Sequence, residues 1–350
     1  MKEAIRTFIQ KEIEQGVTPG AVIRVRHKGE IILDESIGTN SLENDQVPIT
    51  SRHVFDMASL TKIMVTLPAI LQLCELGELY LHDKVSTFLP AFKSHGKEHL
   101  TIQQLLTHSS GLIAHRPYFE RKLSKQEVLT EINEEQLVYK PDTAVIYSDL
   151  GFIILMDIIE HITKQSLDVY AAEHIFKPLS MKTTGYLPNF NRTQYAPTEY
   201  LDHLQSHKYG IVHDDNTEFM GGISGHAGLF STMEDLSIFT KMLEHDGVYE
   251  GRKIVDSNWL ALARKNFTPY SDESRGLGWQ LKGNGASPVG DLMSAQTYGH
   301  TGFTGTSFYI DPVKEITVML LTNRVYFGRT QSMIRLRPRL HNIICTSIEC

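Results

Sequence analysis

A serine and a lysine stand three residues apart, as Ser59 and Lys62, in the otherwise apolar stretch FDMASLTKIM at 55–64. A lysine on an apolar helix face costs stability unless it is paired or has a function. The spacing alone is weak evidence, because a chain of this length should contain about one or two such pairs by chance. The residue types nevertheless suit an activated nucleophile, in which an amine takes the proton of a hydroxyl.

The place of Ser59 at the expected start of an apolar helix favours this chemistry. Free backbone N–H groups and the positive end of the helix dipole would stabilise an alkoxide or oxyanion there. Lys62, one turn later, returns to the same face. A lysine shielded from water loses part of its preference for being charged, so that it could accept the serine proton. Alternatively, Ser59 caps the helix and Lys62 extends to solvent.

A second Ser-x-x-Lys pair occurs at Ser94 and Lys97. It lies in a polar segment that contains Gly96, and this composition predicts a loop rather than a helix start. A loop offers no aligned N–H groups for an oxyanion. Only the first pair is therefore placed for catalysis.

Two further stretches bring polar groups next to segments expected to be buried. Tyr-Ser-Asp at 147–149 precedes the apolar helix pattern LGFIILMDII and marks a turn beside buried structure. A second Tyr-Ser-Asp at 270–272 lies in a polar run, where we expect an exposed loop. His-Thr-Gly at 300–302 enters a strand, and its glycine would let the backbone approach a ligand closely.

The elements that must position these residues fall into three parts of the chain. Residues 1–17 have an amphipathic helix pattern, and a hairpin of two strands follows over 21–38. Strands return from about residue 276, and a last helix is expected over 332–344. This order predicts an α+β fold, in which an antiparallel sheet built from both chain ends is flanked by terminal helices and a mainly helical domain is inserted.

The domains expected from this order are an α/β domain of residues 1–80 and 270–350 and a mainly helical domain of residues 81–269, with the site in the cleft between them. Several local features are also predicted. They are a kink at Pro68 in the helix that starts near Leu60, a capping box of Ser231 and Glu234, and an exposed face of the last helix that carries Arg335, Arg337 and Arg339.

Composition bounds the function classes. The chain has 350 residues, of which 41% are hydrophobic and 21% charged, and its formal net charge of -7 makes nucleic acid a poor partner. Cys74, Cys345 and Cys350 are an odd number without disulfide or zinc spacing, which fits a reducing compartment. No signal-peptide core or membrane-length segment is visible, so we expect a cytoplasmic protein as written, or an extracytoplasmic one if a leader has been removed. Nothing indicates an oligomeric state.

Taken together, the three motifs resemble those of the serine penicillin-recognising enzymes. These are the class C β-lactamases, the D-alanyl-D-alanine peptidases and the family VIII esterases, and their pattern is Ser-x-x-Lys, then Tyr-x-Asn, then Lys/His-Thr-Gly. The segments LLTHSSGL, GHAGLFSTMEDL and LLTNR also resemble connecting segments of that family, so the resemblance extends over most of the chain. It implies a β-lactamase/transpeptidase-like fold.

The resemblance also implies catalytic roles for particular residues. Ser59 would be the nucleophile that forms an acyl-enzyme, and Lys62 would help to remove its proton. Tyr147 would shuttle protons during acylation and then towards water or the leaving group. The backbone N–H groups of Ser59 and Phe303 would form the oxyanion hole.

Substrate binding is implied for five further residues. Ser148 and Asp149 would line the cleft, His300 and Thr301 would bind a substrate carboxylate or shape the field along the strand, and Gly302 would allow close approach. Asp149 replaces the family's asparagine and can only accept hydrogen bonds when ionised. His300 replaces the lysine of most β-lactamases, and an imidazole with its ordinary pKa near ~6.5 is only partly charged at neutral pH.

These features predict a serine acyl hydrolase that acts on β-lactams, D-alanyl peptides or small esters through a covalent intermediate, without metal or cofactor. The alternative is a non-hydrolytic penicillin-binding sensor or decoy that stays acylated. An α/β-hydrolase is disfavoured because Gly-x-Ser-x-Gly is absent, with His226 in place of the last glycine of the nearest match. His203 and His207 lack the pattern of a zinc hydrolase. His213 and Asp214 could line the cleft, although loop packing is the simpler role.

Overall fold

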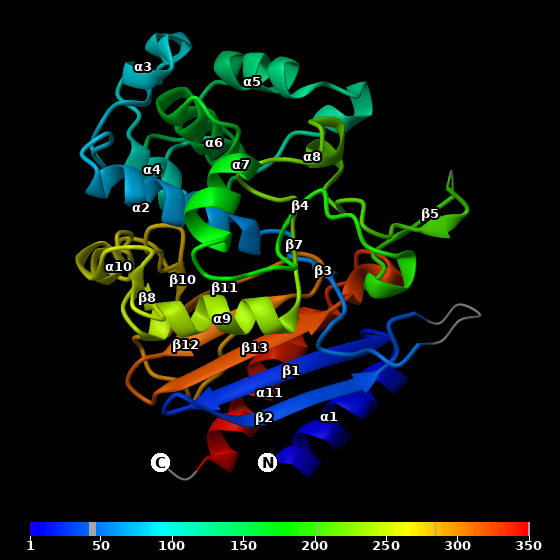
Figure 1. Cartoon of the computed structure of the whole chain (residues 1–350). Coiled ribbons are helices and arrows are strands. Elements are labelled where there is room, and N and C mark those ends of the chain that lie inside the picture. The colour runs from blue at the N-terminus through cyan, green and yellow to red at the C-terminus, as the bar shows by residue number, and fades with distance from the viewer. Residues whose placement is uncertain (42–46, 203, 284, 349–350) are drawn as a thin grey trace.

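The centre of the fold is a six-stranded antiparallel sheet, in which the two ends of the chain lie side by side. A computed structural model of the chain describes residues 1–41, 47–202, 204–283 and 285–348. Figure 1 shows a blue strand from the N-terminal end beside an orange strand from the C-terminal part, with most of the helices above the sheet. In spatial order the strands are β10 (Gln280–Leu281), β11 (Tyr298–Thr301), β12 (Ser307–Asp311), β13 (Ile316–Thr322), β1 (Gly20–His27) and β2 (Glu30–Gly38).

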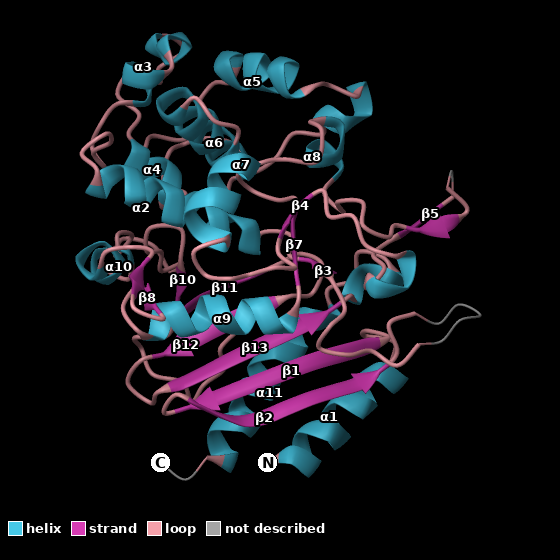
Figure 2. Ribbon diagram, viewed as in Figure 1, coloured by secondary structure: helices cyan, strands magenta, loops and turns pink. Residues whose placement is uncertain are grey.

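Strand β1 shows how the alternation of side chains builds two layers on this sheet. Successive side chains of a strand point to opposite faces. Ala21, Ile23 and Val25 pack in one apolar cluster with the terminal helices α1 (Lys2–Glu14) and α11 (Ser332–Ser347). Arg24 lies on the other face, where its guanidinium contacts Glu234 of helix α9 (Met233–Glu244) at 2.8 Å. The sheet is therefore covered by the chain ends on one side and by α9 on the other (Figure 2).

Above α9 lies the helical part, which is organised around helix α6. Nearly every side chain from Leu150 to Ile159 is buried, which is the pattern of a helix packed on all sides. The other helices are α2 (Leu67–Glu75), α3 (Val85–Phe88), α4 (Ile102–Leu106), α5 (Lys125–Glu134), α6 itself (Asp149–Thr163), α7 (Leu167–Ala171), α8 (Asp215–Phe219) and α10 (Ser257–Ala263).

Short elements complete the described chain. Two π-helical turns cover Lys62–Thr66 and Ala172–Phe176, and 3-10 turns cover Pro90–Lys93, Tyr118–Arg121, Arg192–Gln194 and Arg324–Phe327. Three small sheets pair β3 (Phe55–Asp56), β7 (Leu229–Ser231) and β4 (Gly185–Tyr186), then β5 (Tyr200–Leu201) with β6 (Ser206–His207), and β8 (Val248–Tyr249) with β9 (Arg252–Lys253).

The predicted fold class is confirmed, because the antiparallel sheet combines both chain ends and the terminal helices flank it. The division into residues 1–80 with 270–350 and residues 81–269 stays a prediction. Helix α9, which belongs to the second range, packs directly on strands β1 and β13. The layers of the fold therefore do not follow the chain order completely.

Two local predictions are wrong, for identifiable reasons. Helix α9 is capped by Thr232, whose side chain accepts a hydrogen bond from the N–H of Asp235, because Ser231 is still paired in strand β7. Arg337 is not on an exposed face, because its guanidinium turns inward and donates to the carbonyl oxygens of Gly302 and Thr306. Burial lowers the pKa of Arg337 to about 10.

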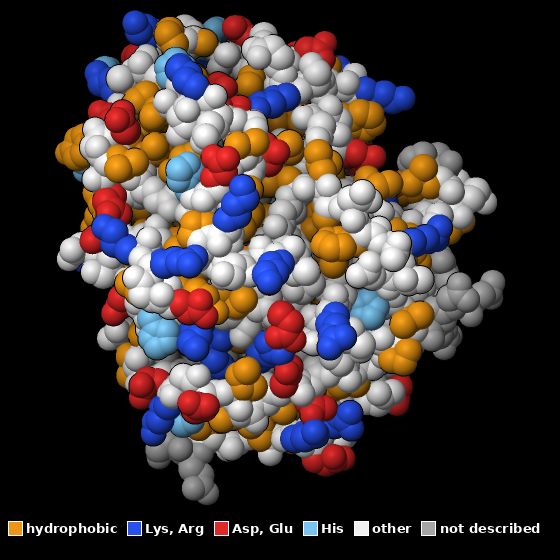
Figure 3. All heavy atoms as spheres, in the orientation of Figure 1, with side chains coloured by type: hydrophobic (Ala, Val, Ile, Leu, Met, Phe, Trp, Pro, Cys, Tyr) orange, Lys and Arg blue, Asp and Glu red, His pale blue; other side chains and the backbone are white. Residues whose placement is uncertain are grey.

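The surface carries both signs of charge. On the face shown in Figure 3, lysine and arginine side chains are interspersed with acidic ones. In the described part of the chain, no helix combines the length and the apolar character that crossing a membrane requires. Burial raises the pKa of the Cys74 thiol to about 12. His203 and Cys350, which entered the sequence arguments above, lie outside the described residues.

Candidate active site

Ser59 lies in a tight turn that joins strand β3 to the first apolar helix. The residue before it, Ala58, has a left-handed backbone with φ of +46°, which is costly for a residue with a side chain. Asp56 holds the turn, because its carboxylate accepts hydrogen bonds from the N–H groups of Ala58 at 2.8 Å and of His213 at 2.6 Å. The strained turn places Ser59 at the start of the helix, as predicted.

The helix that follows begins with a wide turn that carries Lys62. The N–H of Leu67 bonds to the carbonyl of Lys62, five residues back, instead of four. Pro68 follows directly and has no N–H to offer, and the π-helical turn lies on its N-terminal side. Such turns are frequent at functional sites, and this one brings Lys62 beneath Ser59. The predicted kink at Pro68 stays a prediction.

The ammonium of Lys62 is fully buried and uses all three of its N–H donors. Its Nζ lies 3.1 Å from Ser59 Oγ, 2.8 Å from Asp149 Oδ1 and 3.3 Å from the carbonyl oxygen of His226. Burial lowers the pKa of Lys62, but the negative charge of Asp149 outweighs burial and raises it above the ordinary value. The expectation that shielding would leave Lys62 ready to accept a proton is therefore wrong, because a carboxylate is buried beside it.

Asp149 is the first residue of α6, where the helix dipole favours negative charge. Burial raises the pKa of Asp149, but the charge of Lys62 outweighs it and holds this pKa well below its usual range. Its second oxygen lies 3.6 Å from Nδ1 of His115, and the hydrogen bond to Asp149 raises the pKa of His115. Asp149 thus stands between the ammonium of Lys62 and the imidazole of His115.

Ser148 has a different environment from the one predicted. It precedes α6 and is buried, its hydroxyl donates to the carbonyl oxygen of Ile113 at 2.7 Å, and its N–H donates to His108 Nδ1 at 3.0 Å. These contacts fix the start of the helix. A role for Ser148 in substrate binding stays a prediction.

Tyr147 lies beside Lys62, with its ring centroid 4.7 Å from Nζ. On other sides it meets the guanidinium carbon of Arg275 at 5.3 Å and the His300 ring at 5.7 Å between centroids. Its hydroxyl is buried and has no hydrogen-bond partner of normal geometry among the described residues. The phenol therefore places a buried oxygen beside two cations.

His300 and Thr301 lie in strand β11, next to Tyr147. Nδ1 of His300 donates to the carbonyl oxygen of Thr301 at 2.7 Å, so Nε2 is the acceptor. Burial and the nearby charges of Arg275 and Lys62 hold the pKa of His300 well below its ordinary value. His300 is thus neutral at neutral pH, not partly charged as expected.

Gly302 directly follows this strand and lies close to Met57, in the segment that leads to Ser59. A Cβ on Gly302 would lie 2.1 Å from Thr306 Oγ1 and 2.6 Å from the carbonyl oxygen of Met57, which only glycine avoids. The next residue, Phe303, has a backbone N–H that forms no hydrogen bond within the described chain, and the same holds for the N–H of Ser59. Two free donors on adjoining turns can bind an oxyanion.

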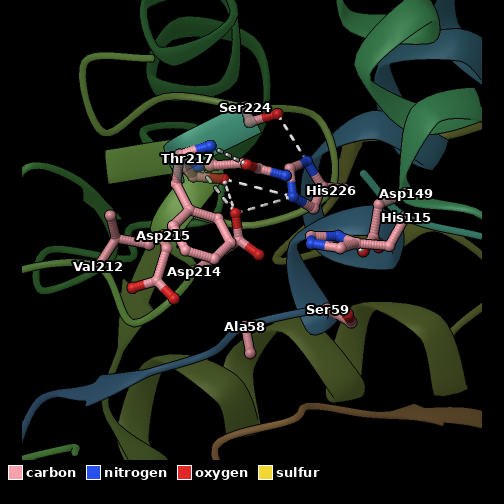
Figure 4. A network of polar contacts seen from close by, with 12 residues as sticks. Ala58, Ser59, His115, Asp149, Val212, Asp214, Asp215, Thr217, Ser224 and His226 are labelled. Atoms are coloured by element: carbon pink, nitrogen blue, oxygen red, sulfur yellow. Dashed lines mark hydrogen bonds and ion pairs between the residues drawn. The ribbon is translucent and has the colours of Figure 1, made fainter. Parts of the chain in front are cut away.

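Part of this set lines a pocket of about 290 Å³, whereas Ser148, His300, Thr301 and Gly302 are not among its lining residues. Of the predicted site residues, Ser59, Tyr147, Asp149 and Phe303 line it, while Lys62 lies beneath Ser59. Figure 4 shows Ser59 below the cluster of His226, Asp214 and Thr217. The remaining lining residues are Ala58, His115, Phe119, His213, Asp214, Asp215, His226, Ala227 and Arg329.

Sequence reasoning missed part of this lining. His115 and Arg329 were not singled out, and His226 entered only as a residue that breaks a hydrolase motif. These side chains come from loops that tertiary contacts hold, so no periodicity or cap marked them. His213 and Asp214 do line the pocket, which goes beyond the loop packing expected of them.

The described residues contain no cluster of three or more histidine, cysteine or acidic side chains suited to a metal ion. What the pocket does hold is a hydroxyl at a helix start, a buried ammonium in contact with it, a phenol and two free backbone donors. This set can activate a nucleophile and stabilise a tetrahedral intermediate.

Comparison with known proteins agrees with this chemistry. The sequence model of the family described as Beta-lactamase matches residues 5–340. A protein of Salmonella enteritidis PT4 named as a D-alanyl-D-alanine carboxypeptidase is 34% identical to this chain over an alignment of 355 positions. The alignment covers 91% of this chain and 81% of that protein.

Two solved structures show the same fold. EstCE1, a hydrolase with promiscuous acyltransferase activity, superposes with a TM-score of 0.77 at 19% identity and covers 97% of this chain and 98% of its own. The octameric penicillin-binding protein homologue from Pyrococcus abyssi gives a TM-score of 0.75 at 23% identity, covering 98% of this chain and 77% of its own.

Proposed function

The chain belongs to the beta-lactamase family and is a serine acyl hydrolase, and from that premise we propose that Ser59 forms the covalent acyl-enzyme. The observation that carries this proposal is the position of Lys62. Its ammonium is buried under the pocket and contacts Ser59 Oγ at 3.1 Å. A buried charge is costly, and here it is paired and aimed at a single hydroxyl of the pocket.

Tyr147 is the proton acceptor in this proposal. Lys62 stays protonated, because the charge of Asp149 raises its pKa, so it cannot serve as the base at neutral pH. In this proposal Tyr147 reacts as the phenolate, whose oxygen takes the proton from Ser59 Oγ and becomes a neutral phenol. The positive charges of Lys62 and Arg275 stabilise that phenolate before the transfer.

Acylation then proceeds by addition and elimination. Ser59 Oγ forms a bond to the substrate carbonyl carbon, and the carbonyl oxygen becomes an oxyanion between the N–H groups of Ser59 and Phe303. When the intermediate collapses, the bond to the leaving group breaks and Tyr147 returns its proton to that group. Water repeats the sequence in the second half, giving up a proton to Tyr147 and releasing the acid from Ser59.

For the substrate, we propose D-alanyl peptides or small esters in preference to β-lactams. The name of the Salmonella relative supports the peptides. His300 is neutral, so this strand offers a substrate carboxylate no imidazolium charge, which favours small esters that carry no carboxylate. We propose that Thr301 contacts the substrate on this side and that Asp149 acts mainly by holding Lys62.

The experiment measures turnover and covalent labelling together. The purified protein is incubated with p-nitrophenyl butyrate and, separately, with a fluorescent penicillin. The proposal predicts steady ester hydrolysis that is lost in Ser59→Ala. A persistent penicillin label without ester turnover would instead support the sensor or decoy, which retention of the whole proton-transfer set disfavours.

A further inference from the structure

The two carboxylate oxygens of Asp214 have different surroundings in the active-site pocket. Oδ1 accepts hydrogen bonds from the backbone N–H and the hydroxyl of Thr217, each at 2.8 Å, and lies 3.1 Å from His226 Nε2. Oδ2 accepts no hydrogen bond from any residue that the structure describes. Figure 4 shows this second oxygen turned towards the space above Ala58 and Ser59. One oxygen thus fixes the side chain, and the other faces the substrate.

The carboxylate of Asp214 is ionised. Burial raises its pKa, but the charge of His226 and its hydrogen bond outweigh burial and bring this pKa well below its usual range. With a proton on Nε2, His226 donates to Asp214 Oδ1, and the Ser224 hydroxyl lies 2.8 Å from its Nδ1. Ser224 and His226 therefore secure Oδ1, while Oδ2 has no hydrogen-bond partner among the described residues.

The other carboxylates of the pocket are already compensated. Asp149 is paired with Lys62. Asp215 uses both oxygens, with one at 3.2 Å from Lys208 and the other at 2.8 Å from Arg329. Among the lining carboxylates of the described chain, Asp214 alone has an oxygen with neither a hydrogen-bond partner nor an ion-pair partner.

Filling the pocket has a different cost for different substrates. A neutral or apolar acyl group would displace water from Asp214 Oδ2 without replacing the lost hydrogen bonds, which costs free energy. An ammonium group would replace that water with a charge-assisted hydrogen bond. Resting on the proposed hydrolase function, we propose that Asp214 Oδ2 binds the ammonium group of substrates that carry a free amine on the acyl side of the scissile bond.

The position of Tyr147 indicates on which side of Ser59 the acyl part of the substrate lies. Tyr147 hands its proton to the leaving group, so that group lies on the Tyr147 side of Ser59. Lys62 Nζ lies 2.8 Å from Asp149 Oδ1 and 4.7 Å from the Tyr147 ring centroid, so Tyr147 lies near Asp149. Figure 4 shows Asp149 to the right and Asp214 to the left, both above Ser59. The part of the substrate that stays on Ser59 is therefore the part that meets Asp214.

The test compares esters that differ only in their amine. Benzyl esters of D- and L-alanine and their N-acetyl counterparts are hydrolysed, and released benzyl alcohol is measured. For the better enantiomer, the wild type is expected to show a kcat/KM at least tenfold higher with the free amine. Asp214→Asn keeps an oxygen for Thr217 and removes the charge, and should lower this preference by about 10- to 100-fold, mainly through KM. Hydrolysis of the N-acetyl ester should change by less than about threefold.

Thr217→Val is the matched control. It removes a hydrogen bond from Asp214 Oδ1 but no charge, so the amine preference should stay within about threefold of the wild type. Equal losses on both esters in Asp214→Asn, or a wild type that hydrolyses p-nitrophenyl butyrate without preferring the amine, would overturn the inference and leave the hydrolase function standing. Absence of turnover with every ester, the butyrate included, would overturn both.

Discussion

The chain contains two Ser-x-x-Lys pairs that both bury their lysine completely, yet the two lysines have opposite electrostatics. Lys62 meets a carboxylate, and the charge of Asp149 raises its pKa despite burial. Lys97 donates to the carbonyl oxygens of Ile132 and Asn133, at 3.0 and 2.8 Å, at the end of helix α5, and its Nζ lies 4.8 Å from the Phe92 ring centroid. Burial lowers the pKa of Lys97 to about 8, although the charges of Glu134 and Glu135 oppose it.

The difference teaches that a buried lysine is not by itself a catalytic base. Lys97 has the lowered pKa that suits a base, but it lies at a helix end, and the Ser94 hydroxyl beside it donates to the carbonyl of Ala91 at 3.2 Å. Lys62 has a raised pKa, which does not suit a base, but its ammonium lies in contact with the Ser59 hydroxyl. We infer that Lys62 acts as a fixed positive charge and Lys97 as a structural cap.

The largest effect expected from this comparison comes from removing the two lysines in turn. Lys62→Met should lower kcat/KM for p-nitrophenyl butyrate by about 1,000-fold or more, because it removes the charge that stabilises proton transfer. Lys97→Met should leave kcat/KM within about twofold and lower the free energy of unfolding by about 1–3 kcal/mol, because two helix carbonyls lose their donor. Thermal unfolding of both variants separates the two effects, and similar activity losses would break the comparison.

One glycine near each Ser-x-x-Lys pair extends the comparison of the two pairs. Gly302→Ala should lower kcat/KM by about 100-fold, because its Cβ would press on Met57 and move the Phe303 N–H from the oxyanion position. Gly96→Ala meets no atom within 4 Å, so only its left-handed backbone is strained and activity should not change. Steady-state ester kinetics with both variants check this. An active Gly302→Ala enzyme would show that the oxyanion hole lies elsewhere.

Asp149 tests whether the charge of Lys62 is needed. A lysine with a raised pKa keeps its charge up to that pKa, so activity should fall as pH rises through it. In Asp149→Asn the raising charge is gone, and the alkaline limb of the kcat/KM profile should move to lower pH, with about a tenfold loss or less at pH 7. An unmoved alkaline limb would mean that Lys62 does not have to be protonated.

The smallest effect concerns stability at Lys97. Its folded pKa of about 8 lies below the ordinary 10.5, so between these values the unfolded state binds more protons and stability rises with pH. The free energy of unfolding of the wild type relative to Lys97→Met should therefore increase by about 2 kcal/mol from pH 8 to 10.5. Urea unfolding at both pH values measures this difference. A difference that shrinks with pH would contradict the lowered pKa.

Much of the fold was predictable because its signals are local. The hairpin turns at Lys28 and Gly29, both chain ends alternate as strands, and Ser59 begins an apolar helix, and all three features are present. The capping of α9 shifted by one residue, from Ser231 to Thr232, because a strand pairing that sequence does not reveal occupies Ser231.

The site was less predictable, because its electrostatics depend on distant contacts. Sequence placed Lys62 near Ser59 but could not place Asp149 against Lys62, and that contact reverses the pKa shift expected from burial. The lowered pKa of His300 likewise depends on its burial and on the nearby charge of Arg275, which follow from folding alone.

The most direct test of the central claim is intact-protein mass spectrometry after brief exposure to a slowly hydrolysed acyl donor such as a penicillin. We predict a single acyl adduct on the wild type, mapped by peptide analysis to Ser59, a full adduct on Ser94→Ala and none on Ser59→Ala. An adduct of equal yield on Ser59→Ala would contradict the account.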